Sequence, residues 1–111
     1  MTARRIGTPH RPSASLCRRI RRHRRAFLAY DRLVPLGDPV DPRFSSEKLD
    51  ALERWQDQEY RRRLELLGHP VRSLADMREK AAYLLTYPRG DYLISGPGDL
   101  VVFLRSLVPQ R

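Results

Sequence analysis

Apolar and aromatic residues recur at steps of three and four positions in two long segments of the chain. The first stripe, whose one polar member is a histidine, is Leu16, Ile20, His23, Phe27, Tyr30 and Val34. Steps of this size place the side chains on one side of a helix. Ser13 or Ser15 can cap the helix start, and Pro35 ends it. The pattern therefore predicts a helix up to Val34 with one side facing a core.

The second segment begins after Ser45 or Ser46 and ends at Gly68, with Pro70 preventing continuation. Its stripe is Leu49, Leu52, Gln56, Tyr60, Leu64 and Leu67, with Trp55 at one edge. Acids and bases four positions apart are expected on the outer face as the pairs Asp50–Arg54, Asp57–Arg61 and Glu59–Arg63. We therefore predict a second long helix with a charge-balanced outer face.

The connection between these helices is rich in turn-forming residues, namely Pro35, Gly37, Pro39 and Pro42. If it folds the helices into an antiparallel hairpin, Ile20 faces Tyr60 and His23 faces Gln56. A buried histidine or amide without a partner costs about 1–3 kcal/mol, but the two can satisfy each other. We therefore expect His23 to be buried against Gln56 or Tyr60.

A third helix is predicted from Ser73 to about Thr86, because Ser73 and Asp76 match a capping box. Its expected stripe is Leu74, Met77, Ala81, Leu84 and Leu85. Arg78 and Lys80 are expected to project outward from this helix.

The last element allows two interpretations. Residues 92–95 and 100–104 could pair as a hairpin around the Gly-Pro-Gly sequence at 96–98. Asp99 could instead cap a helix, which we prefer because the apolar pattern continues to Val108. The predicted fold class is therefore all-α, with a long antiparallel helical hairpin and two shorter packed helices. Residues 1–12 are expected to form a disordered basic tail, and residues 13–111 one helical domain.

Arginine is concentrated in the first predicted helix, with six arginines between positions 18 and 25. Arg18, Arg21, Arg22 and Arg25 lie opposite the apolar stripe and form a candidate polyanion-binding face. A solvated face, or one that contacts an acidic protein or a membrane surface, remains an alternative. The arginines also crowd the helix start, where the helix dipole favours anions, so an anionic group is expected near that end.

The net charge of +9 is unevenly distributed. Residues 1–32 contain ten arginines and one acid, whereas residues 33–111 carry equal numbers of basic and acidic side chains. Such asymmetry is typical of a basic arm that contacts a polyanion, although a terminal extension without a partner has the same composition.

Other chemistry is not indicated by the sequence. Cys17 is the one cysteine, so no intramolecular disulfide can form, and a reducing, cytoplasmic setting is expected. No apolar run is long enough for a transmembrane segment. The three histidines lack metal-ligand spacing, and no nucleophile or acid–base pair can be nominated. We therefore expect no metal, no cofactor and no catalytic residue.

Two segments, residues 23–30 (HRRAFLAY) and 72–82 (RSLADMREKAA), resemble parts of small helical proteins of unknown function from GC-rich proteobacteria. The resemblance implies an all-helical fold and a bacterial cytosolic setting, and it transfers no activity. Our leading expectation is a non-enzymatic interaction or regulatory protein that acts with a protein partner or as a homodimer. The alternative is an RNA- or DNA-binding protein that uses the arginine face.

Overall fold

The computed structural model describes residues 11–86 and 97–108. Every regular element in these ranges is helical, which confirms the all-α prediction. The elements are α1 (Ala14–Leu33), the short 3-10 helix η1 (Val34–Gly37), α2 (Ser46–Gly68), α3 (Leu74–Thr86) and α4 (Pro97–Ser106). The predicted tail falls mostly on residues 1–10, which lie outside the described ranges.

Serine side chains cap the starts of the first three α-helices, as the sequence predicted. Each hydroxyl oxygen accepts a hydrogen bond from the backbone N–H group three residues later: Ser13 from Leu16 (3.3 Å), Ser45 from Lys48 (3.2 Å) and Ser73 from Asp76 (3.0 Å). These bonds satisfy donors that would otherwise have no partner in the first helical turn.

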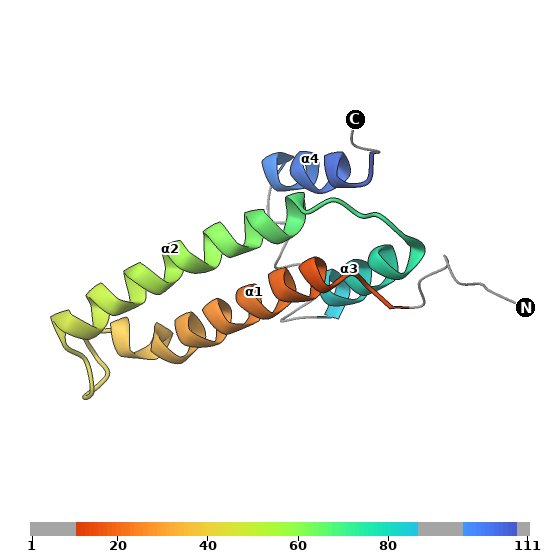
Figure 1. Ribbon diagram of the computed structural model, residues 1–111. Coiled ribbons are helices and arrows are strands. Elements are labelled where there is room, and N and C mark those ends of the chain that lie inside the picture. Colours follow the sequence, from red (N-terminus) through yellow and green to blue (C-terminus); the bar gives the residue numbers. More distant parts are fainter. Residues whose placement is uncertain (1–10, 87–96, 109–111) are drawn as a thin grey trace, which may run out of the picture.

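α1 and α2 form a long antiparallel hairpin with η1 at its closed end (Figure 1). α3 packs against α1, and α4 packs against α2, both near the open end of the hairpin (Figure 1). The core lies at this open end and consists of Leu16, Ile20, Leu66, Leu67, Tyr83 and Leu84, with Val102 and Phe103 packed against it. The two shorter helices therefore cover the end of the hairpin at which the apolar core residues of α1 and α2 lie.

The predicted inward face of α2 is wrong in the middle of the helix. Gln56 and Tyr60 are exposed, whereas Glu59 and Leu66 are buried. The prediction placed Glu59 on the outer face, because a glutamate without a charged partner is almost never buried. Glu59 is buried because His23 and Arg63 contact its carboxylate, and this pairing decides which side of α2 faces α1.

The predicted orientation of α3 is also wrong. Lys80, expected to project outward, is only 1 % exposed, while Leu74 and Leu85 of the predicted stripe are more than half exposed. Leu84 of the predicted stripe is buried as expected, but the rest of the buried side of α3 carries Asp76, Lys80 and Tyr83. Two of these are ionised side chains, so partners elsewhere in the fold must compensate their burial.

Lys80 joins the C-terminal ends of two helices. Its Nζ donates to the backbone oxygens of Leu67 (2.7 Å) and His69 (2.8 Å) at the end of α2, and to Ser106 Oγ (2.8 Å) at the end of α4. The last carbonyl groups of a helix lack intrahelical partners and carry partial negative charge. An ammonium group with three N–H donors therefore matches this position.

Asp76 places a negative charge at the start of α1, as Lys80 places a positive charge at helix C-termini. Its carboxylate accepts hydrogen bonds from the backbone N–H groups of Ser13 (2.6 Å) and Arg72 (3.1 Å). The anionic group expected near the arginine-rich helix start is therefore present within the chain itself. The negative charge of Asp76 interacts favourably with the positive end of the α1 dipole, whereas arginines there interact unfavourably.

The last element is a helix, as preferred from the sequence, and Leu100–Leu104 therefore do not form a strand. It begins at Pro97, so Asp99 lies in its first turn and does not cap it. The Asp99 carboxylate instead accepts a hydrogen bond from Arg63 Nη1 (3.4 Å), which ties α4 to α2. Residues 92–95 of the alternative hairpin lie outside the described ranges.

The burial of Lys80 predicts a pH-dependent stability. Desolvation lowers the pKa of Lys80 from 10.5 to about 8, so the native state releases this proton before the unfolded state does. Between pH 8 and 10.5 the unfolded state binds more protons, and the contribution of Lys80 to the free energy of unfolding must rise with pH. A shift of this size corresponds to about 3 kcal/mol over the whole window.

The measurement is urea denaturation of the wild type and Lys80→Met across this window. We expect the difference in free energy of unfolding to move in favour of the wild type as the pH rises. Lys48→Met is the matched control, because Lys48 donates to the Arg43 backbone oxygen in an exposed hydrogen bond. A difference between wild type and Lys80→Met that is independent of pH would contradict the prediction.

Candidate functional site

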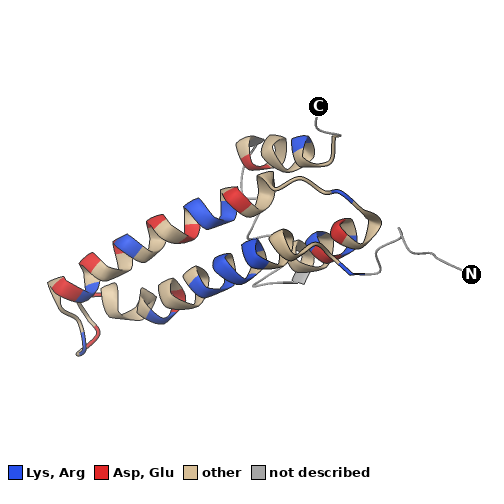
Figure 2. Cartoon of the chain, viewed as in Figure 1, with Lys and Arg blue, Asp and Glu red and all other residues tan. Residues whose placement is uncertain are grey.

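The four arginines predicted as a polyanion-binding face are all exposed on α1: Arg18, Arg21, Arg22 and Arg25. Figure 2 shows basic residues concentrated along this helix, whereas basic and acidic residues alternate along α2. None of the four forms an ion pair with any residue in the described ranges. We refer to these four residues as the arginine face.

Acidic residues of α2 are engaged with arginines of the same helix. Asp57 pairs with Arg61 (3.1 Å), as predicted, and Glu65 pairs with Arg62 (3.1 Å). These exposed pairs contribute little stability. They do, however, neutralise charge locally on α2, and no acidic side chain of α2 forms an ion pair with the arginine face within the described ranges.

Trp55 of α2 lies beside the arginine face, which sequence reasoning missed. Its side chain is 36 % exposed, and it lines two open grooves along α1. The larger groove, of about 560 Å³, is lined by Arg21, Arg24, Arg25, Leu28, Ala29, Arg32 and Trp55. The smaller groove, of about 300 Å³, is lined by Arg22, Arg25, Ala26, Trp55, Gln58 and Arg62. Arg25 and Trp55 border both grooves.

The position of Trp55 follows from the rotation of α2. Trp55 precedes Glu59 by about one helical turn, so both side chains leave the helix on nearly the same side. The pairing of Glu59 with His23 therefore also turns Trp55 toward α1. The sequence placed Trp55 only at the edge of a stripe, because it did not indicate that a carboxylate would be buried.

Apart from the arginine face, a buried cluster of polar side chains lies inside the hairpin and links all four α-helices. His23 of α1 contacts Tyr83 Oη through Nδ1 (2.6 Å) and Glu59 Oε2 through Nε2 (2.9 Å). Arg63 continues the chain, with Nε 3.3 Å from Glu59 Oε2 and Nη1 3.4 Å from Asp99 Oδ2. The cluster thus connects α3, α1, α2 and α4 through consecutive side-chain contacts.

The predicted burial of His23 is confirmed, but its predicted partners are wrong. His23 is 0 % exposed and contacts Glu59 and Tyr83, not Gln56 or Tyr60. A carboxylate can only accept, so we assign the Nε2 proton to the bond with Glu59. In the neutral ring Nδ1 then accepts from the Tyr83 hydroxyl. The expected pairing was displaced by three residues, from Gln56 to Glu59.

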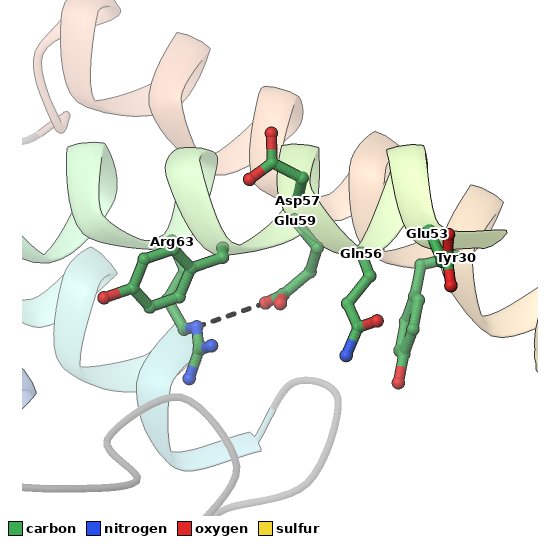
Figure 3. Close-up of a pocket in the computed structure, with 7 residues that line it drawn as sticks. Tyr30, Glu53, Gln56, Asp57, Glu59 and Arg63 are labelled. Atoms are coloured by element: carbon green, nitrogen blue, oxygen red, sulfur yellow. Dashed lines mark ion pairs between the residues drawn. The ribbon is translucent and has the colours of Figure 1, made fainter. Parts of the chain in front are cut away.

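A polar pocket of about 410 Å³ opens beside this cluster. Its lining residues are Tyr30, Glu53, Gln56, Asp57, Glu59, Tyr60 and Arg63. Figure 3 shows the Glu59–Arg63 ion pair, with Gln56 beside it and Asp57 directed elsewhere. Glu59 is only 2 % exposed, and its contacting oxygen is shared by His23 and Arg63. The geometry therefore gives this carboxylate a structural role.

Other reactive groups in the described ranges stand apart. Cys17 is a free, partly buried thiol. His69 Nε2 lies 3.0 Å from Ser15 Oγ, and burial together with nearby Arg19 lowers the pKa of His69. Within residues 11–86 and 97–108 no three metal-ligating side chains come together. The same ranges contain no helix that is long and apolar enough to cross a membrane.

Comparison of the chain with protein-family models, with curated proteins and with solved structures found no match. The resemblance to small proteobacterial proteins stays a prediction. The site must therefore be interpreted from its own geometry.

The buried cluster predicts that glutamate-to-glutamine substitutions at two positions of α2 lower the free energy of unfolding by very different amounts. Glu59→Gln removes a buried carboxylate from His23 and Arg63, and we expect a loss of about 1–3 kcal/mol in the free energy of unfolding. Glu65→Gln is the matched control, because its partner Arg62 is on the surface, and we expect a loss below about 0.5 kcal/mol. Thermal and urea denaturation measure both, and equal losses would show that the Glu59 pairs add nothing.

Proposed function

We propose that this chain is a small, non-enzymatic, cytoplasmic protein that binds nucleic acid through the arginine face of α1. The observation that carries the proposal is the set of four exposed arginines without an ion pair in the described part of the chain. Lysine and arginine side chains that neutralise phosphates release condensed counterions, which supplies most of the affinity of non-specific nucleic-acid binding.

The spacing of the arginine face supports an extended polyanion. Arg18, Arg22 and Arg25 are separated by about one helical turn, and each turn advances about 5.4 Å. A row of regularly placed guanidinium groups suits a chain with a repeating negative charge. Guanidinium groups also bind phosphate in a bidentate manner.

A membrane surface fits this face less well. Helices that lie in a membrane interface insert an apolar side next to their basic side. In α1 the apolar side is occupied by the protein core, since Leu16 and Ile20 are buried against α2 and its neighbours. α1 therefore has few apolar groups left to insert, although its arginines remain available.

Removal of the arginine face should abolish this binding. For the wild type with four phosphate contacts, affinity for a single strand should fall about 50-fold between 50 and 200 mM salt. In the variant Arg18→Ala, Arg21→Ala, Arg22→Ala, Arg25→Ala we expect the slope of log affinity against log salt to flatten by about 3. Fluorescence anisotropy of a labelled oligonucleotide over a salt series measures both quantities.

The matched control removes the same charge elsewhere. Arg43, Arg61, Arg72 and Arg78 are replaced by alanine together, since all four are exposed and none belongs to the arginine face. This control should keep most of the wild-type affinity and salt slope. If both variants bind equally well, or lose affinity equally, the arginine face has no special role and the proposal fails.

A second candidate function, a protein-binding surface or homodimer contact, is favoured by a separate observation. Large apolar side chains are exposed on α3 and α4: Leu74, Met77 and Leu85 on α3, and Leu100, Val101 and Leu104 on α4. Apolar surface of this kind on a small chain is typical of an interface.

The homodimer form of this second function predicts a concentration-dependent mass. Leu85 is 69 % exposed, so Leu85→Glu should leave the fold intact and weaken a dimer that uses α3. Analytical ultracentrifugation of the wild type and Leu85→Glu measures this, with Val40→Glu, far from α3 and also exposed, as control. A wild type that stays monomeric at all concentrations would rule out the homodimer.

A further inference from the structure

The structure places a free aromatic ring among the cations of α1. Trp55 has no hydrogen-bond, stacking or cation–π partner among the described residues, whereas other aromatic rings are engaged. Tyr83, for example, lies below Arg24, with the guanidinium carbon 5.4 Å from the ring centroid, and Tyr60 contacts Arg63 in the same way at 5.3 Å. The Trp55 ring is therefore an exposed aromatic group without a stacking or cation–π partner among the described residues.

The surroundings of Trp55 carry positive charge on both sides. Arg21 and Arg25 line the groove on one side, and Arg22 and Arg62 line the groove on the other. Arg62 also pairs with Glu65, but the other three have no ion pair within the described ranges. A ligand that covers the ring therefore has guanidinium groups in the grooves on both sides of it.

We propose that the two grooves bind single-stranded nucleic acid, with one base stacked on Trp55 and the neighbouring phosphates on Arg21, Arg22 and Arg25. Single-strand-binding proteins combine basic grooves with aromatic rings in this way, because every base offers a π-face. A duplex keeps its base faces stacked inside, so it can contact the arginines but not the ring. The inference rests on the proposed nucleic-acid binding and specifies its substrate class.

The test compares polyanions that do and do not offer free bases. Oligothymidylate, an abasic oligonucleotide of the same length, the corresponding duplex and heparin all present a polyanion, but only the first offers free bases. Trp55 is the one tryptophan in the chain, so its intrinsic fluorescence reports on this ring alone. We expect oligothymidylate to quench this fluorescence, whereas the abasic strand, the duplex and heparin bind without comparable quenching.

Two substitutions separate stacking from packing. Trp55→Leu keeps an apolar side chain in the groove that Ala26 also lines but removes the aromatic ring, and Trp55→Phe keeps a smaller ring. We expect Trp55→Leu to lower the affinity for oligothymidylate about tenfold, with little change for the abasic strand. Trp55→Phe should retain more of the preference for bases. The melting temperature of each variant is measured alongside, so that a loss of fold is recognised.

The outcomes distinguish this inference from the function on which it rests. If Trp55→Leu discriminates between oligothymidylate and the abasic strand as well as the wild type does, stacking is wrong, while arginine-dependent binding stands. Equal loss of affinity for all ligands in Trp55→Leu would likewise show a purely structural ring. If replacement of the arginine face leaves binding intact, the proposed function itself is wrong.

Discussion

The open end of the helical hairpin is held by two oppositely charged side chains on one side of α3. Asp76 and Lys80 stand four residues apart, so both leave α3 in the same direction. Asp76 accepts a hydrogen bond from the N–H group of Ser13, the residue that caps α1, and Lys80 donates to carbonyl groups at the end of α2. Each charge meets the helix end of opposite sign. An antiparallel hairpin necessarily presents both kinds of end at its open side, so one short helix can satisfy both.

The buried cluster around His23 has a different effect, because it selects one packing among several. Apolar side chains alone allow α2 to rotate, since leucines occur on more than one side of it. A buried glutamate without His23 and Arg63 would lose several kcal/mol, so rotations that separate them are penalised. Tyr83 and Asp99 extend the same requirement to α3 and α4. Burial of charge here adds little net stability, but it supports a single arrangement of the four helices.

The helix boundaries could be predicted from the sequence because they depend on neighbouring residues. Ser13, Ser45 and Ser73 cap helices through hydrogen bonds to residues three positions later, and such contacts are visible in a linear pattern. The inward sides of α2 and α3 depend on partners far along the chain. Glu59 is buried because of His23, and Lys80 because of carbonyl groups 11 and 13 residues away and Ser106. Polarity at a single position cannot reveal such partners.

The candidate site combines a predictable part with an unpredictable one. The exposed arginines follow from the phase of α1, which its apolar stripe determines. Trp55 could not be assigned to them, because its direction depends on the rotation of α2 and thus on the buried Glu59. The same ion pairs that fix the rotation of α2 therefore also bring an aromatic ring to the basic helix. Asp76, Glu59 and Asp99 are all engaged inside the fold, and the arginine face has no ion pair within the described ranges.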